Sequence, residues 1–180
     1  MVVTQRISIH TADLRQAIPR LRAGDQILLS GTLYTARDAA HKRLMALLDA
    51  GEPLPFPLQD SVIYYCGSTP PPAGAPIGAC GPTTSSRMDP YTPRLYSLGV
   101  CATVGKGERN AATCAALRQY GGIYLCAIGG AGALAARQVV DSRVIAFEDL
   151  GCEAIKQLTV RDFPLFVAED MYGGSLFFTK

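Results

Sequence analysis

Closely spaced metal-binding residues are missing from this sequence of 180 residues. Its six cysteines form no CxxC pair and no other short chelating spacing, which argues against a zinc site or a redox dithiol. We therefore expect no metal ion within this chain and reduced, mostly buried thiols, because a free cysteine packs as a small hydrophobic residue. The six cysteines are Cys66, Cys80, Cys101, Cys114, Cys126 and Cys152.

A strong excess of one charge and a long hydrophobic run are missing as well. The 17 basic and 15 acidic side chains leave a formal net charge of +2, too small an excess to indicate nucleic-acid binding. No apolar run approaches the roughly 20 residues that a membrane-spanning helix needs. The opening residues MVVTQRISIH lack the basic-then-apolar order of a secretory signal. We therefore expect a cytoplasmic protein that binds no nucleic acid and no membrane, and whose anionic ligand would be small.

The chain does contain enough hydrophobic material for an ordinary core. Hydrophobic residues make up 48% of the sequence and charged residues 18%, a balance that argues against intrinsic disorder. No internal repeat and no linker divides the chain, and its length suits one domain. The sequence therefore predicts a single domain over residues 1–180.

Hydrophobic patterning predicts a mixed α/β domain with more strand than helix. The opening residues alternate in polarity, and several later runs are rich in strand-forming residues. The predicted strands cover residues 2–9, 25–34, 61–67, 100–104, 122–128, 143–147, 155–160 and 163–168, and the predicted helices cover residues 11–22, 38–50 and 108–120. The helix over residues 38–50 is the best defined, because an acidic residue begins it and Gly51 follows it.

Proline dominates the segment from residue 68 to residue 93. Seven prolines and three glycines in this segment prevent a regular helix or a central strand from running through most of it. Irregular segments of this length inside a compact domain are usually functional or disordered. The polar run TTSSRMD within it favours a functional role.

Three short segments place a cation beside glycine or hydroxyl residues, an arrangement that suits an anion. They are YTARD at residues 34–38, GPTTSSRMD at residues 81–89 and GKG at residues 105–107. Arginine can bind a carboxylate with two parallel hydrogen bonds, while hydroxyls and loop amides satisfy the remaining oxygen lone pairs. Arg37 also stands at a predicted strand-to-helix junction, where free amides favour negative charge. A dicarboxylate would need two such groups.

Structural explanations for the same residues stay open at this point. Arg37 can be a solvated surface group, and the hydroxyls at residues 83–86 can form turns and caps. Arg87 can pair with the nearby Asp89. His41 lies one helical turn after Arg37, and a histidine in a helix is more often structural than catalytic. The chain has no GxxxxGK loop, GxGxxG frame or GxSxG elbow, which disfavours nucleotide binding and a serine hydrolase.

Four segments together resemble one known enzyme family. They are SGTLYTARDAAHKRL at residues 30–44, IYYCGSTPPPAG at residues 63–74, IGACGPTTSSRMDPYTPRL at residues 77–95 and VGKG at residues 104–107. In order and spacing they are similar to the β subunit, or C-terminal domain, of class I iron-sulfur fumarate hydratases and L(+)-tartrate dehydratases. The resemblance covers nearly the whole chain, with a departure at Glu108-Arg109-Asn110, where the family pattern leads by a shorter route to asparagine. It implies a three-layer swivelling β/β/α fold with mixed sheets and few helices.

The same resemblance implies an incomplete enzyme. In this family a 4Fe–4S cluster is bound by the α subunit or N-terminal domain, which these 180 residues do not include, and it acts as a Lewis acid on the substrate. We therefore expect activity only with an α subunit, in an assembly of two α and two β chains. The implied reaction is the reversible hydration of fumarate to (S)-malate. The alternatives are the dehydration of L(+)-tartrate to oxaloacetate and a noncatalytic anion-binding or assembly module.

The family motifs also imply roles for individual residues. Arg37, Arg87 and Lys106 match residues that bind the substrate carboxylates, and Thr84 matches a residue that adds a hydroxyl contact. Thr83 matches the proposed catalytic base, which removes a proton from C3 of the substrate. A neutral threonine is a weak base, so in this family a carboxylate of the α subunit accepts its proton. The cations stabilise the negative charge that develops beside the substrate carboxylate.

Overall fold

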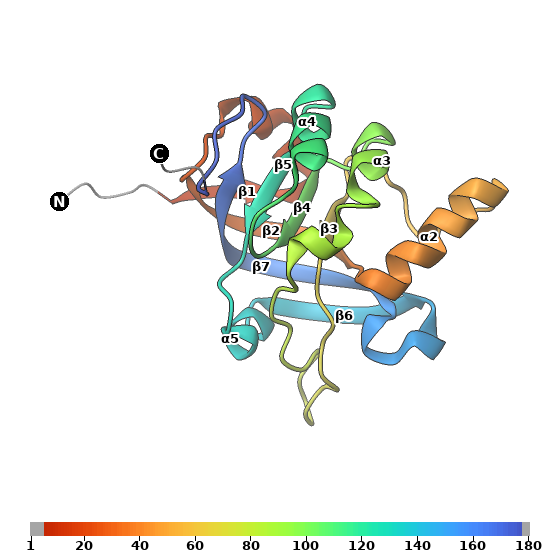
Figure 1. Cartoon of the computed structure of the whole chain (residues 1–180). Coiled ribbons are helices and arrows are strands. Elements are labelled where there is room, and N and C mark those ends of the chain that lie inside the picture. The colour runs from red at the N-terminus through yellow and green to blue at the C-terminus, as the bar shows by residue number, and fades with distance from the viewer. Residues whose placement is uncertain (1–5, 178–180) are drawn as a thin grey trace.

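The computed structural model describes residues 6–177, which form seven strands and a smaller helical part (Figure 1). The strands are β1 (Ile7–His10), β2 (Gln26–Thr35), β3 (Val62–Tyr64), β4 (Ala102–Gly105), β5 (Ile123–Cys126), β6 (Val139–Ala146) and β7 (Ile155–Glu169). The α-helices are α1 (Leu14–Ala17), α2 (Asp38–Ala50), α3 (Thr92–Ser97), α4 (Ala111–Gln119) and α5 (Gly132–Ala136). Short 3-10 helices are η1 (Thr11–Asp13), η2 (Ile18–Arg20), η3 (Ser85–Met88) and η4 (Glu148–Glu153).

One sheet contains the seven described strands and closes on itself. Its order is β1-β2-β3-β4-β5-β7-β6, and β2 also pairs with β7, so β2, β3, β4, β5 and β7 form a closed five-stranded barrel. Neighbouring strands from β1 to β5 are parallel, whereas β7 is antiparallel to β2, β5 and β6. Helices α2, α3 and α4 lie outside the wall formed by β3, β4 and β5 (Figure 1). The predicted α/β fold with mixed sheets and few helices is confirmed.

Alternation along the strands separates the barrel interior from a second hydrophobic layer. Val62 and Tyr64 of β3 belong to the main cluster, which fills the barrel. Ile63 and Tyr65 face the other way and pack with residues of α2. Successive side chains of a strand point to opposite faces, so β3 is buried on both sides. This explains the continuous apolar run in the sequence of β3.

Helix α2 has the bounds that the sequence predicts. It begins at Asp38, whose negative charge complements the amino-terminal end of the helix dipole, and it ends where Gly51 adopts a left-handed φ of 66°. Ala40 and Leu44 are fully buried against the outer face of the barrel. This packing fixes the first turn of α2 beside the end of β2.

The first and last strands differ from their predicted bounds. β1 begins at Ile7, and residues 2–5 of the predicted strand lie outside the described residues. The two last predicted strands are one strand, β7, which passes through Asp162 at a left-handed φ of 51°. The pairing of β2 with β7 shifts register between Leu29 and Gly31, opposite this point. A bulge therefore absorbs the bend and lets the strand continue.

Helix α4 begins later than predicted, at Ala111. The Asn110 side chain accepts a hydrogen bond from the Thr113 N–H at 2.8 Å and so caps the helix. Residues before this cap belong to the loop that follows β4. Among the described helices, none is both long and apolar enough to cross a membrane.

Candidate functional site

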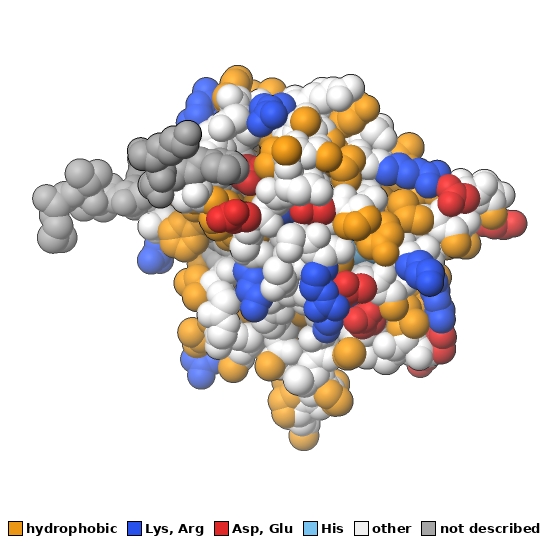
Figure 2. Space-filling model, in the orientation of Figure 1, with side chains coloured by type: hydrophobic (Ala, Val, Ile, Leu, Met, Phe, Trp, Pro, Cys, Tyr) orange, Lys and Arg blue, Asp and Glu red, His pale blue; other side chains and the backbone are white. Residues whose placement is uncertain are grey.

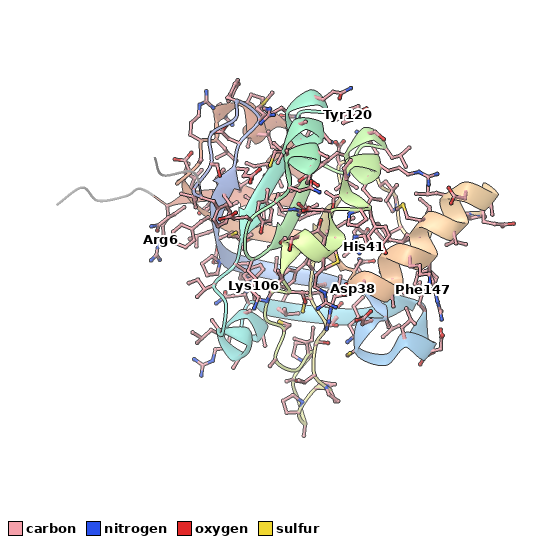
Figure 3. All side chains as sticks on the ribbon, viewed as in Figure 1. Arg6, Asp38, His41, Lys106, Tyr120 and Phe147 are labelled. Carbon is pink, nitrogen blue, oxygen red and sulfur yellow. The ribbon has the colours of Figure 1, made fainter. Side chains whose placement is uncertain are left out.

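The predicted anion-binding segments meet at one edge of the barrel. Because β2, β3 and β4 are parallel, their carboxyl ends lie at the same edge. Figure 3 shows Asp38 in the first turn of α2 and Lys106 after β4 on the same side of the molecule. In the same orientation, Figure 2 shows basic side chains with acidic side chains beside them in this region. We call the predicted residues at this place the edge site: Arg37, Thr83, Thr84, Arg87 and Lys106.

Arg37 stands between β2 and α2 and has two acidic neighbours. It is the N-cap residue of α2, and its side chain is 22% exposed. Its Nη2 lies 3.5 Å from Glu153 Oε1, and its Nε lies 3.9 Å from Asp38 Oδ2. Gly67 leaves room for the guanidinium, because a Cβ at that position would lie 2.7 Å from Arg37 Nη1. Arg37 is therefore an oriented, partly buried cation and not a solvated surface group.

Arg87 reaches the same place from the proline-rich segment. Its Nε donates to Asp38 Oδ1 at 2.9 Å, and its Nη2 lies 2.9 Å from Asp38 Oδ2. Asp89, the alternative partner in the sequence, pairs instead with Arg109. The Arg87 side chain is 51% exposed, and within residues 6–177 its Nη1 donates no hydrogen bond. The outer edge of this guanidinium is available to a ligand carboxylate.

Backbone hydrogen bonds fix Thr83 and Thr84 against the end of β4. The Thr83 N–H donates to the Tyr65 carbonyl at 2.7 Å, and the Thr83 carbonyl accepts from the Lys106 N–H at 3.3 Å. The Ser85 N–H donates to the Lys106 carbonyl at 2.8 Å, which pairs Thr84 with Lys106 in a parallel bridge. The structure thus brings both threonines and Lys106 together.

Gly105 makes this close approach sterically possible. A Cβ at Gly105 would lie 2.0 Å from Ser85 Oγ and 2.9 Å from a ring carbon of Tyr65. Any larger residue would push the threonine segment away from β4. Thr83 is half-buried, while Thr84 and Lys106 are exposed, so the side chains of this part of the edge site are accessible from solvent.

A buried ion pair supports the two loops from beneath. Arg109 Nε donates to Asp89 Oδ1 at 2.7 Å, and the two side chains are 0% and 4% exposed. The remaining Arg109 N–H groups donate to three hydroxyls, those of Tyr65, Thr92 and Thr103. Asp89 Oδ2 also accepts from the Asn110 N–H at 2.8 Å. Arg109 and Asn110 belong to the three residues at which the chain departs from the family pattern. Through Asp89 they connect the loop after Lys106 to the segment that contains Thr83 and Thr84.

His41 is buried beneath Arg37. Its Nδ1 lies 2.8 Å from the Arg37 carbonyl oxygen, and the rings of Tyr65 and Tyr91 pack against it with centroids at 5.5 Å. Burial lowers the pKa of His41 to about 4, although the hydrogen bond to the Arg37 carbonyl acts in the opposite direction. The neutral ring at pH 7 donates from Nδ1 to that carbonyl. His41 is a structural residue, as the sequence favours.

Two further side chains beside the edge site carry no sequence signal. Besides its contact with Arg37, Glu153 accepts a hydrogen bond from the Ala39 N–H at 2.9 Å through Oε2. Lys156 Nζ donates to the hydroxyl of Ser68, next to the glycine that makes room for Arg37. Both residues come from the start of β7 and the turn before it. Only the closure of the barrel brings them near residues of α2 and of the segment that follows β3.

The cysteines agree with the sequence prediction. All six are free, and Cys66, Cys80, Cys101 and Cys114 are buried. A hydrogen bond with Cys80 and burial raise the pKa of the Cys66 thiol, so this thiol remains protonated. In the part of the chain that the structure describes, no group of three or more His, Cys, Asp or Glu side chains is arranged to hold a metal ion.

Comparison with known proteins gives two long relatives of this chain. Fumarate hydratase 2 of Leishmania major is 38% identical over 166 residues, which cover 91% of this chain and 29% of that protein. The "Fumarate hydratase class I, anaerobic" of Escherichia coli (strain K12) is 41% identical over 154 residues, which cover 84% of this chain and 28% of that protein. This chain thus spans less than a third of the length of either relative.

A third relative is similar over most of its own length. The "Putative L(+)-tartrate dehydratase subunit beta" of Methanocaldococcus jannaschii is 37% identical over 174 residues, which cover 91% of this chain and 87% of that protein. The family described as Fumarase C-terminus matches residues 2–180. The match spans the motifs that form the edge site and nearly all of the remaining sequence. The chain therefore belongs to the Fumarase C-terminus family.

Proposed function

We propose that this chain is the β-type subunit of a hydro-lyase that reversibly hydrates fumarate to (S)-malate. The observation that carries the proposal is the meeting of Arg37, Arg87 and Lys106 with two threonines at one edge of the barrel. Cations from separate segments suit a ligand that has two carboxylates. The names of the two long relatives support fumarate as this ligand.

The cations and Thr84 would bind and orient the dicarboxylate. Arg37 and Arg87 lie on either side of Asp38 and would bind one carboxylate, while Lys106 would bind the other. Thr84 is paired with Lys106 through the backbone and would add a hydroxyl contact. Fixing both ends of a short substrate places its C2 and C3 atoms at defined positions, which is a large part of catalysis by orientation.

Thr83 is the proposed base of the reaction. In the direction of dehydration, its Oγ takes the proton from C3 while its own proton passes to an acceptor, and the C3 electron pair forms the double bond as the C2 hydroxyl departs. Hydrogen bonds to Tyr65 and Lys106 fix its backbone, and within residues 6–177 its hydroxyl has no hydrogen-bond partner. The family resemblance supports a carboxylate of the α-type subunit as this acceptor. Lys106 and the arginines would stabilise the charge that develops on the substrate.

The proposal includes a second subunit that holds the cofactor. A 4Fe–4S cluster on an α-type subunit would supply a Lewis acid for the hydroxyl group that leaves. The family resemblance and the words "subunit beta" in the name of one relative support such a partner, with two α and two β chains in the assembly. The six free thiols are consistent with a reducing compartment, the cytoplasm, and the chain itself would form one domain over residues 1–180.

L(+)-tartrate dehydratase is the second candidate function. The observation that favours it is the relative with this name, which is 37% identical to this chain and matches it over 87% of its own length. Tartrate has one more hydroxyl, at C3. Which groups of the assembled enzyme meet that hydroxyl would decide between the two substrates, because a site built for an extra hydroxyl discriminates strongly against a ligand without it.

Co-expression of the full chain with its α-type subunit under anaerobic conditions tests the proposal. Fumarate, (S)-malate and L(+)-tartrate would be assayed in parallel. We expect rapid interconversion of fumarate and (S)-malate by the assembled pair and no turnover by this chain alone. Preferential formation of oxaloacetate from tartrate would favour the second candidate. An intact cluster without turnover of any of the three compounds would favour a noncatalytic module.

Thr83→Val tests the residue proposed as the base. We expect kcat to fall by about 10²–10⁴-fold, the usual contribution of a positioned general base, because valine keeps the shape of threonine but accepts no proton. Thr159→Val on β7 is the matched control, since Thr159 is also half-buried and lies away from the edge site. Unchanged kcat in Thr83→Val would remove Thr83 from this role.

A further inference from the structure

Asp38 is an acidic residue in the middle of a site built for anions. Its Oδ1 accepts from Arg87 Nε at 2.9 Å, and its Oδ2 lies 2.9 Å from Arg87 Nη2 and 3.9 Å from Arg37 Nε. The carboxylate thus lies between the two guanidiniums, in the place labelled in Figure 3. It occupies the inner edge of Arg87 and leaves the outer edge for a ligand.

Two buried polar atoms face each other at this place without a hydrogen bond. Within the described residues, Arg37 Nε and Asp38 Oδ2 are both buried. Arg37 Nε has no hydrogen-bond partner, and Asp38 Oδ2 has only its ion-pair contact with Arg87 Nη2. Their separation of 3.9 Å is too long for a hydrogen bond but short enough for strong attraction. Asp38 therefore acts on both guanidiniums at once, through a direct bond to Arg87 and through charge on Arg37.

A carboxylate at this position opposes the binding of every anion. A half-exposed arginine alone would attract a ligand more strongly but would sample many rotamers. Pairing with Asp38 fixes the direction of Arg87, and the same negative charge repels each further charge on the ligand. We propose that Asp38 is the positioning and specificity-determining residue of the edge site, where it directs the outer edge of Arg87 and discriminates against a third ligand carboxylate.

A purely structural role for Asp38 predicts a different result. As an acid in the first turn of α2, Asp38 stabilises the helix through the dipole, and its removal would then change stability alone. The same helix provides a matched control near its other end. Asp49 accepts from Arg94 Nη1 at 2.6 Å in an exposed ion pair outside the edge site. Asp38→Asn and Asp49→Asn therefore remove the same charge from the same helix at two places.

Nuclear magnetic resonance titration of the full chain tests the inference. Wild type, Asp38→Asn and Asp49→Asn would be titrated at pH 7.5 and constant ionic strength with acetate, succinate and tricarballylate, which carry one, two and three charges. The amide signals of Thr84 and Lys106 report binding. Removing one negative charge at about 6 Å in water strengthens binding about threefold for each ligand charge, so the ratio of the tricarballylate to the succinate Kd should fall about threefold in Asp38→Asn. The ratio should not change in Asp49→Asn.

The Arg87 Nε–H signal gives a second readout, which does not depend on ligand affinity. We expect slow exchange of this proton with water in wild type and in Asp49→Asn, and faster exchange in Asp38→Asn, because the charged acceptor is lost. In the double variant Arg87→Gln/Asp38→Asn, the ratio of the tricarballylate to the succinate Kd should still be about threefold lower than in wild type, because the charge of Asp38 acts on the ligand directly. An equal Kd ratio in Asp38→Asn and wild type, an equal change in Asp49→Asn, or binding of none of the three ligands by wild type would overturn the inference.

The inference rests on the proposed dicarboxylate site, but its test can be separated from that of the reaction. If the assembled enzyme does not hydrate fumarate and the Kd ratio still falls in Asp38→Asn, the proposed reaction fails and the role of Asp38 stands. If the enzyme is active and the ratio does not change, the reaction stands and the role of Asp38 fails.

Discussion

Two arginine–aspartate pairs occupy the same small region and differ in almost every physical respect. Arg109 and Asp89 are completely enclosed, with side chains 0% and 4% exposed, whereas Arg87 and Asp38 are 51% and 33% exposed. Arg109 donates to three hydroxyls besides its carboxylate partner. Within residues 6–177, Arg87 donates only to Asp38. The N–H groups of Arg109 donate to partners within the fold, whereas Arg87 keeps N–H groups that can donate to a ligand.

This difference in burial indicates that the Arg109–Asp89 pair stabilises the fold and that Arg87 is available for ligand binding. Burial of a charged pair costs free energy unless neighbouring polar groups satisfy it, and the Arg109 pair has such neighbours on two loops. An exposed pair contributes little to stability, because water screens it. Arg87 can therefore bind a ligand in place of water, and this binding does not disturb an interaction on which the stability of the fold depends. Neither pair follows from proximity in the sequence, since Arg109 and Asp89 are 20 residues apart and Arg87 and Asp38 are 49 residues apart.

Arg109→Met should have the largest effect on folding. Methionine fills similar space but leaves the Asp89 carboxylate buried without its cation, which typically costs about 3–5 kcal/mol of the free energy of unfolding. Urea denaturation of the full chain measures this. Arg94→Met, which removes an exposed partner of Asp49, is the control and should cost less than about 1 kcal/mol. Similar losses in both variants would remove the distinction between the two kinds of pair.

Protonation of the buried His41 should lower the free energy of unfolding slightly less than Arg109→Met does. The pKa of His41 is about 4 in the folded chain and about 6.5 in the unfolded chain, so between these values the unfolded chain binds more protons. The free energy of unfolding should therefore fall as the pH is lowered through this range, by up to about 3 kcal/mol. Denaturation at pH 7, 5.5 and 4.5 measures the fall.

Two histidine variants isolate this contribution. In His41→Asn the side-chain amide can still donate to the Arg37 carbonyl but does not titrate, so the fall between pH 7 and pH 4.5 should be reduced. His10→Asn, a change at an exposed position outside the edge site, is the control. If the fall in His41→Asn equals that in wild type, the buried imidazole is not its source.

Local signals in the sequence predicted the parts of the fold that depend on neighbours along the chain. Helix α2 has its predicted bounds because Asp38, its leucines and Gly51 act within a few residues of one another. β7 was predicted as two strands, over residues 155–160 and 163–168, with a break at residues 161 and 162. Pairing with β2 over most of its length overrides that local signal, and a bulge absorbs the irregularity.

The edge site divides in the same way. The cations and threonines belong to recognisable motifs, so the sequence alone predicts Arg37, Thr83 and Lys106 as residues of one site. Their acidic partners could not be assigned, because a carboxylate carries no signal of which arginine it will meet. Asp89 is close to Arg87 in the chain but pairs with Arg109, and Asp38 takes its place from another element. Tertiary packing decides these pairs, and the roles of the motif residues remain predictions.

Arg87→Met gives the smallest expected effect on folding and the sharpest contrast with Arg109. Loss of the exposed pair with Asp38 should change the free energy of unfolding by less than about 1 kcal/mol. The succinate Kd should nevertheless rise by about tenfold or more, because a hydrogen bond to a charged group contributes about 1.5–3 kcal/mol. Urea denaturation and an NMR titration of the same samples measure both quantities. A large loss of stability, or an unchanged Kd, would mean that Arg87 supports the fold as Arg109 does and that exposure does not distinguish the two arginines.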